Sequence, residues 1–375
     1  MFLTGKLIRE AKSRKMQTKA HLDTPALLVD IDKMRRNIKR MADFTRECSV
    51  NLRPHAKTHK VPEIAKMQVE AGAKGICVQK LSEAQVFGDH GFTDIFITNE
   101  VVGEQKLVKL AELADEIDLT IAVDNEENVA DLSKACSKVG SELNIMVDID
   151  IGMHRCGILP NEAATLAGIV SKQKNLIFKG LMGYEGHVGR GKTTKEREDL
   201  SRAAMDQMVF AKKEVRRAGL EIEVTSVGSS VSTWVNAKHP EVTEVQPGMY
   251  VFNAVNLVDA KVATFDDCAL TVLSTVMSTP TENRVILDAG SKAFHFDQCR
   301  FPHLIGYDAE IDHFSEEHGY VTIKNKTGKV PRLGEKVEAI PFHCCTCVNE
   351  HDEMIAIRDG KVEKVWKIAG RGMMK

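Results

Sequence analysis

Two kinds of hydrophobic pattern alternate along the first two thirds of the chain. Short, mostly apolar runs that are typical of buried strands lie at 50–55, 75–78, 94–99, 119–124, 143–150, 176–184, 221–228 and 243–250. Helical spacing of apolar residues separates nearly all of them, as at 104–116, 126–139, 161–173 and 195–218. Eight such units predict a parallel (β/α)8 barrel. A doubly wound open sheet is the structural alternative, but no GxGxxG motif follows the first strand.

The two ends of the chain have a different pattern. After about residue 262, strand-like runs are separated by Gly, Pro and charged turns without a clear helix, which predicts a mostly antiparallel β domain over 262–375. Residues 24–30 form an apolar strand-like run, and we expect the segment 1–30 to pack on this β domain. The barrel domain then occupies 31–261, beginning with an amphipathic helix. The basic stretch 1–22 has Glu10, little Ser and no long apolar core, which favours a surface helix over a targeting peptide.

Composition excludes several classes of protein. The 375 residues are 43% hydrophobic and 28% charged, as in globular proteins, and the net charge of −2 predicts no strong attraction to nucleic acid or anionic lipid. No apolar run approaches the roughly 20 residues of a membrane span. The nine cysteines lack the spacing of a disulfide framework, which predicts free thiols and a cytoplasmic location.

Candidate chemical groups follow the predicted strands, at the end where such barrels carry their sites. "RPHAKTHK" (53–60) follows the first strand, and positive neighbours would lower the pKa of Lys57 and make its amine nucleophilic. "VGSSVST" (227–233) and "QPGMY" (246–250) follow strands seven and eight, where this architecture binds phosphate. A nucleophilic lysine with a phosphate cradle fits a Schiff base to pyridoxal 5'-phosphate (PLP). The simpler alternatives are a solvated lysine and a serine-rich helix cap.

"HCCTC" (343–347) is a candidate metal site. On a strand, His343, Cys345 and Cys347 would share one face, and imidazole and thiolate are good zinc ligands. A catalytic ion held by His343 and Cys345 would keep open positions. The alternatives are a structural site completed by Cys347, with or without His351, or buried thiols.

These motifs together carry a family resemblance. "PALLVDIDKMRRNI", "RPHAKTHK", "DIDIGMHRCG", "VGSSVST", "EVQPGMYVF", "DAGSKAF", "SEEHG" and "PFHCCTCVN" resemble, in this order, the D-threonine aldolases and metal-dependent D-serine dehydratases. These are PLP enzymes of the alanine racemase fold type, and the resemblance covers about residues 22 to 372. It implies the same barrel followed by a β domain.

The resemblance also implies roles for individual residues. Lys57 would form the Schiff base, Arg155 would hydrogen-bond near the cofactor phenolic oxygen, and Tyr184 would face the pyridine nitrogen. The phosphate would be surrounded by Gly228, Ser229, Ser230, Gly248, Met249 and Tyr250. His343 and Cys345 would hold a divalent metal, with zinc expected and manganese or magnesium as alternatives. His55 and His59 are candidate bases.

The expected function is therefore a PLP- and metal-dependent lyase that acts on small D-amino acids with a β-hydroxyl group. Dehydration to a 2-oxo acid and ammonia is favoured over retro-aldol cleavage, because dehydratases of the family tend to have Cys, and aldolases Asp, at the second metal position. An amino-acid racemase and a non-catalytic PLP carrier are the alternatives, and neither would need the metal motif. The resemblance further suggests a homodimer.

Overall fold

The computed structural model describes residues 18–325 and 327–375, so most of the basic stretch expected to form a surface helix lies outside the described residues. The chain divides into two compact units. The barrel unit contains Lys39–Lys57, Pro62–Gly248 and Gly372–Lys375, and the β unit contains the residues up to Ile38, Thr58–Val61 and Met249–Arg371. Within the described ranges, every helix is too short or too polar to cross a lipid bilayer.

The barrel unit is built on an eight-stranded parallel sheet. Its strands are β2 (Asn51–Leu52), β3 (Ile76–Val78), β4 (Asp94–Ile97), β5 (Asp118–Val123), β6 (Leu143–Asp148), β7 (Leu176–Met182), β8 (Val224–Val227) and β9 (Glu244–Val245). They pair in the order β2-β9-β8-β7-β6-β5-β4-β3. A bridge between His55 and Cys77, with the Cys77 N–H donating to Pro54 O at 2.9 Å, connects the two terminal strands. The predicted barrel is confirmed.

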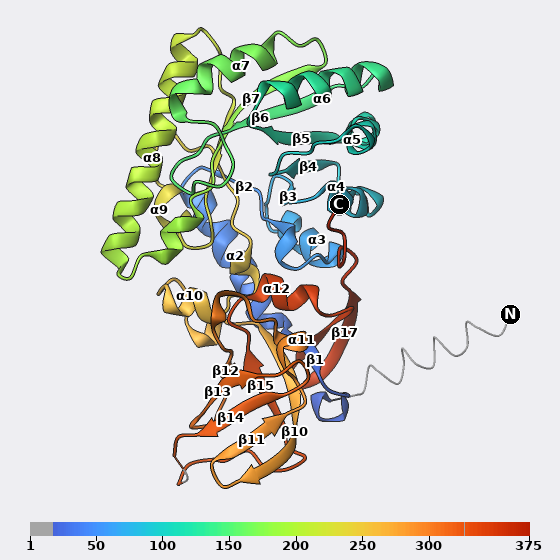
Figure 1. The fold of residues 1–375 in the computed structure, drawn as a ribbon, viewed down its shortest axis with the longest axis vertical. Helices are drawn as coiled ribbons and strands as arrows, with labels where there is room; N and C mark the ends of the chain where they lie inside the picture. Colours follow the sequence, from blue (N-terminus) through green and yellow to red (C-terminus); the bar gives the residue numbers. More distant parts are fainter. Residues whose placement is uncertain (1–17, 326) are drawn as a thin grey trace, which may run out of the picture. The chain divides into compact units, whose positions relative to one another are not determined.

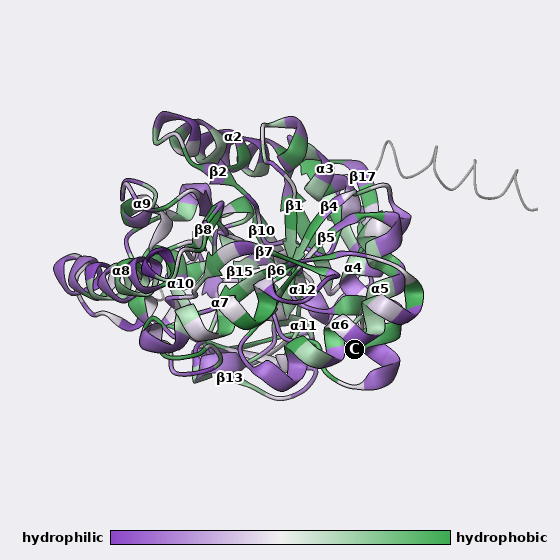
Figure 2. Ribbon diagram, turned by 90° about the horizontal axis from the view of Figure 1, so that it is seen from above, coloured by the Kyte–Doolittle hydropathy of each residue, from purple (hydrophilic) through white to green (hydrophobic). Residues whose placement is uncertain are grey.

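Helices follow the strands and cover the outside of the sheet (Figure 1). They are α3 (Pro62–Glu70), α4 (Leu81–Asp89), α5 (Glu104–Glu116), α6 (Glu126–Val139), α7 (Ala163–Ser171), α8 (Thr194–Arg217) and the short α9 (Thr233–Asn236). In α5, Leu107, Leu110 and Ala111 are buried at the i, i+3, i+4 spacing of one helix face. Figure 2 shows this division between buried and exposed faces, since the strands are hydrophobic and the outer side of α8 is largely hydrophilic.

The β unit surrounds its own mostly antiparallel sheet. Its strands are β1 (Ala26–Asp30), β10 (Leu270–Thr281), β11 (Arg284–Leu287), β12 (His303–Leu304), β13 (Ala309–Phe314), β14 (Gly319–Ile323), β15 (Lys336–Ile340), β16 (Glu353–Arg358) and β17 (Lys361–Lys367). They pair in the order β13-β14-β11-β10-β1-β16-β17, with β15 joining β10 to β12. The N-terminal β1 is antiparallel to β10 and parallel to β16. Helix α2 (Ile31–Glu47) follows β1.

The β unit differs from expectation in two respects. It contains the short helices α10 (Val255–Asp259), α11 (Ser291–Phe294) and α12 (Cys344–Asn349), which are too short to give a recognisable period. In addition, the C-terminal segment of the β unit begins at Met249, whereas the sequence pattern predicts a boundary near residue 262. Backbone bonds from Val255 N to Pro341 O (3.3 Å) and from Asn256 N to Phe342 O (3.1 Å) attach this segment to the β unit.

Candidate active site

Lys57 lies just after β2, in the short 3-10 helix Ala56–Thr58, and is half-buried. Its Nζ donates to Gln79 Oε1 at 3.1 Å and lies 5.9 Å from the centre of the Tyr184 ring. The Arg155 guanidinium lies 5.1 Å from the same ring centre. Tyr184 follows β7 and Arg155 follows β6, so the parallel strands bring these three predicted cofactor residues together at their carboxyl ends.

Arg53 and Lys60 of "RPHAKTHK" have different polar partners. Arg53, 5% exposed, pairs with Asp94 (2.5 Å) and Glu244 (2.9 Å). Lys60 donates to Asn349 Oδ1 at 2.9 Å. Asp94 and Glu244 therefore neutralise the charge of Arg53, one of the positive neighbours of Lys57 in the sequence, whereas the partner of Lys60 is a neutral amide.

The two candidate bases have different surroundings. His55 Nε2 lies 3.1 Å from Gln79 Oε1 and 3.0 Å from Thr98 Oγ1, so His55 and Lys57 contact the same amide oxygen. His59 belongs to the β unit, where it is fully buried and its Nδ1 accepts a hydrogen bond from Val61 N at 3.1 Å. The barrel unit thus places His55 beside Lys57.

The predicted phosphate loop follows β8. Gly228 has a φ of +108°, and a Cβ there would meet Thr233 Oγ1 at 2.9 Å, so the turn requires glycine. Ser229 Oγ lies 2.9 Å from Ser232 Oγ, and Ser230 is 6% exposed. These residues form a compact, hydroxyl-rich turn. Among the other predicted phosphate residues, Gly248 ends a segment of the barrel unit, while Met249 and Tyr250 begin a 3-10 helix of the β unit.

Glu185, a polar residue of the "GYEGHVG" stretch to which the sequence assigned no role, is fully buried beneath this loop. Its carboxylate accepts hydrogen bonds from Gly228 N (3.2 Å), Ser232 Oγ and Asn236 Nδ2 (2.9 Å). Burial raises the pKa of Glu185, although the three donors act in the opposite direction.

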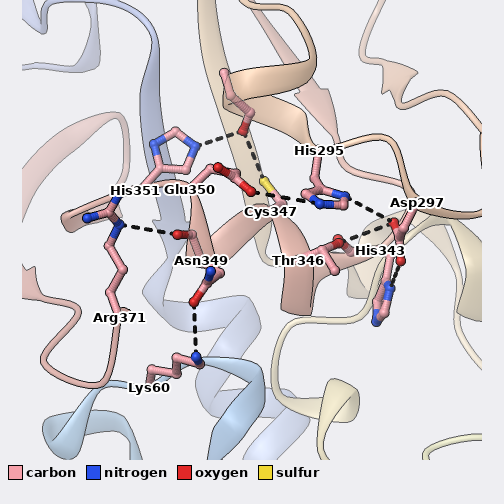
Figure 3. Close-up of polar contacts among 11 residues, drawn as sticks. Lys60, His295, Asp297, His343, Thr346, Cys347, Asn349, Glu350, His351 and Arg371 are labelled. Carbon is pink, nitrogen blue, oxygen red and sulfur yellow. Dashed lines mark hydrogen bonds and ion pairs between the residues drawn. The ribbon is translucent and has the colours of Figure 1, made fainter. Parts of the chain in front are cut away.

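The predicted metal residues lie at the start of a helix rather than on a strand. His343 has extended backbone angles, and α12 begins at Cys344, so the expected common strand face of His343, Cys345 and Cys347 does not form. Cys347 Sγ and His351 Nε2 instead lie 3.4 Å and 2.8 Å from the carbonyl oxygen of Ala293 (Figure 3). Cys347 and His351 are therefore engaged with a backbone carbonyl, which leaves His343 and Cys345 as the candidate ligand pair.

Asp297 orients His343. The Nδ1–H of His343 donates to Asp297 Oδ2 at 2.5 Å, and Thr346 Oγ1 donates to the other carboxylate oxygen at 3.2 Å (Figure 3). Burial disfavours the imidazolium, but the Cys345 thiolate and Asp297 outweigh this effect and raise the pKa of His343 to about 10. A hydrogen bond from Cys344 and the charge of His343 hold the pKa of Cys345 well below its usual value, despite burial.

This donor set suits a divalent metal of the zinc type, because a thiolate and an imidazole with its Nδ1 already bonded to a carboxylate are its usual partners. His343 Nε2 is the nitrogen that can face an ion. Cys345 Sγ also lies 3.4 Å from the hydroxyl of Thr58, the residue that follows Lys57 in the chain.

A second group of potential ligands was not predicted. Glu100, Asp124 and Cys156 place one ligand atom each within 4.8 Å of one another, and residues 18–325 and 327–375 contain no other group of three. Burial raises the pKa of Glu100 and that of the neighbouring Asp148. These acidic side chains lie close enough to Arg155 for its charge to favour their ionised forms.

Comparisons with known proteins assign the family. The alanine racemase N-terminal domain matches residues 29–255, and a putative serine dehydratase domain matches residues 269–357. A D-threonine aldolase from Arthrobacter is 35% identical over 95% of this chain and 94% of its own length. The chain belongs to this family of PLP-dependent lyases. Its relatives include aldolases and dehydratases.

Solved structures of the lyase family support the same assignment. D-threonine aldolase from Filomicrobium marinum superposes with a TM-score of 0.93 at 34% identity, covering 96% of this chain and 99% of that one. A metal-free cysteine-to-alanine variant of D-threo-3-hydroxyaspartate dehydratase gives 0.87 at 27% identity, covering 94% and 98%. A variant of the same dehydratase with alanine for a histidine two residues earlier gives 0.88 at 26% identity, covering 96% and 98%.

Proposed function

We propose that this lyase uses PLP and a divalent metal to dehydrate D-amino acids that carry a β-hydroxyl group, with D-serine and related 3-hydroxy-amino acids as substrates. The observation that carries the proposal is the His343 and Cys345 donor pair, oriented by Asp297, in a chain that also gathers Lys57, Tyr184 and Arg155. A histidine and a cysteine with the same spacing are the substituted residues in the dehydratase variants, one of them metal-free.

The barrel unit offers groups that fit PLP. Lys57 supplies the primary amine that would bind its carbonyl carbon, and the Tyr184 ring lies near both that amine and Arg155. The Gly228–Ser230 turn would hold the phosphate. When bound, the cofactor supplies an electron sink for the charge that develops at the substrate Cα. Lys57 would then be the base that takes the Cα proton, and Gln79 holds its amine by the 3.1 Å hydrogen bond.

The β unit offers the metal ligands. His343 Nε2 and Cys345 Sγ would hold the ion, with zinc as the preferred metal and manganese or magnesium as alternatives. The ion supplies Lewis acidity that assists departure of the β-hydroxyl group, which is otherwise a poor leaving group. Asp297 keeps the imidazole in one orientation, and the lowered pKa of Cys345 favours the thiolate form that binds metal.

Retro-aldol cleavage to glycine and an aldehyde is the second candidate. Sequence identity favours this reaction, because the chain is 35% and 34% identical to the two D-threonine aldolases and 27% identical to the dehydratase variant. This reaction needs a base for the β-hydroxyl proton, and His55 is a suitable residue because it shares Gln79 with Lys57.

Product analysis distinguishes these reactions. The protein is incubated with PLP, zinc and either D-serine or D-threonine. Pyruvate or 2-oxobutyrate with ammonia supports dehydration, whereas glycine with an aldehyde supports aldol cleavage. Racemisation alone, or full activity after removal of all metal by a chelator, contradicts the metal-dependent lyase.

We also propose a cytoplasmic homodimer. The location is supported by nine cysteines that are all free thiols. The dimer is supported by the family resemblance.

A further inference from the structure

A buried carboxylate lies under the loop that follows β8. Glu185 is the third residue after β7, and its side chain has no exposure to solvent. A carboxylate without water is unfavourable unless donors replace its hydration. Its position directly beneath a loop proposed to bind another anion therefore needs a structural reason.

The donors to Glu185 come from one short segment. Gly228 N donates to Oε2 at 3.2 Å, whereas Ser232 Oγ and Asn236 Nδ2 donate to Oε1, the latter at 2.9 Å. These residues lie at the first position of the loop, at its far end and in α9. A single side chain thus ties together both ends of the turn.

The turn is further closed by its own hydrogen bonds. Ser229 N donates to Ser232 Oγ at 2.9 Å, so the hydroxyl that contacts Glu185 also fixes the backbone of Ser229. Ser201 Oγ donates to Asn236 Oδ1 at 2.5 Å and fixes the amide that contacts Glu185. A loop held in one conformation binds an anion more tightly than a mobile one, because less conformational entropy is lost on binding.

We propose that Glu185 is a positioning residue that orders residues 228–232 and thereby sets the affinity of the protein for the phosphate group of PLP. The proposal rests on the proposed function, which places that phosphate at this loop. Glu185 acts through Gly228 and Ser232 and does not itself touch the phosphate.

The test compares two ligands that differ only in the phosphate group. PLP and pyridoxal are titrated into the full-length, cofactor-depleted wild type and the Glu185→Gln variant, with dissociation constants from protein fluorescence. The substituted side chain carries an NH2 group in place of one carboxylate oxygen, so at least one charge-assisted hydrogen bond to the loop is lost. The preference for PLP over pyridoxal should therefore fall about tenfold. The affinity for pyridoxal should change less than about threefold.

A matched control is Glu244→Gln. Glu244 is also a buried carboxylate of the barrel unit and accepts bonds from Ser226 Oγ (2.7 Å) and Arg53 Nε (2.9 Å), outside this loop. This variant should keep the wild-type preference for PLP. Equal losses of PLP and pyridoxal affinity in Glu185→Gln, or tighter PLP binding, would overturn the inference.

Two further results separate the possible failures. A wild type that binds pyridoxal as tightly as PLP contradicts the proposed phosphate site itself, independently of Glu185. Ser232→Ala removes one donor to Glu185 and keeps the carboxylate. This variant therefore replaces Glu185→Gln in the test if Glu185→Gln does not fold. It should lower the PLP preference, and the loss in the double variant should be smaller than the sum of the two single losses, because both changes break the bond between Ser232 and Glu185. If the two losses of PLP preference add up in full, Glu185 and Ser232 do not act through the same hydrogen bond, and the inference is contradicted.

Discussion

Asp297 should control the metal affinity of the proposed site. It accepts a 2.5 Å hydrogen bond from His343 Nδ1, and its own pKa is lowered, because the His343 and Thr346 bonds outweigh the effect of burial. The residue is thus a carboxylate that holds the ring with Nε2 available. Replacing Asp297 by Asn keeps the shape but removes the negative charge.

The expected loss follows from the bond that is weakened. A hydrogen bond to a charged group is worth about 1.5–3 kcal/mol net, and a neutral acceptor retains about half of this. The Asn variant should therefore lose about 0.75–1.5 kcal/mol, which is about 4- to 13-fold in zinc affinity. Asp297→Ala removes the whole bond, so its loss should approach the upper end of the roughly 10- to 100-fold range for outer-shell partners of metal ligands.

Competitive titration of zinc against a coloured chelator measures this affinity on the folded protein. Thr346→Val is the control, because it removes the 3.2 Å bond to the other oxygen of Asp297 and leaves His343 in place, so its effect should be smaller than that of Asn. Wild-type zinc affinity in both Asp297 variants would refute the reasoning. If His343→Ala also binds zinc like the wild type, the assignment of the metal site itself is wrong.

Three other perturbations test the proposal or the fold. Lys57→Ala should abolish the visible absorbance of bound PLP, whereas Lys60→Ala should keep it, because Lys60 is bonded to Asn349; the reverse result would contradict the assignment. Glu241→Gln should cost about 2 kcal/mol of unfolding free energy at pH 7, discounted for partial exposure, because buried Lys212 loses its 2.8 Å partner. The Lys212 hydrogen bond lowers the pKa of Glu241 below its usual 4.5 in the folded protein. This stabilisation is therefore present above about pH 4.5 and is lost as the pH falls through the folded pKa. A stability difference between the variant and the wild type that persists in urea unfolding near about pH 3 would disprove this prediction. Sedimentation should show a dimer, and a fully active monomer would exclude that prediction.

The barrel could be predicted because its signals are local. The expected helices at 104–116 and 126–139 coincide with α5 and α6, since apolar spacing within one element is set by the face it buries. Helix α12 spans only Cys344–Asn349, fewer than two turns, so no period distinguishes it from a strand. The sequence therefore shows the residue types of the proposed metal ligands but does not reveal their secondary structure.

Residues that act on others could not be predicted in the same way. Asp297 is 46 positions from His343, and Glu185 is 43 positions from Gly228, so only the folded chain brings each pair together. The balance of charge around Arg53 depends on Asp94 and Glu244, which enter from two other strands. Counting nearby cations in the sequence overestimated the positive charge for this reason.

The place of β1 in the sheet has a consequence for synthesis of the protein. Leu28 pairs with Thr271 of β10 on one side and with Ile355 of β16 on the other. At roughly 10 residues per second, about half a minute separates translation of β1 from translation of its second neighbour. During that interval the apolar strand has an unpaired edge, which is a site for aggregation. We therefore expect the nascent chain to need protection by a chaperone until its last strands emerge from the ribosome, and a premature stop before β16 to yield an insoluble product even though every barrel strand is complete.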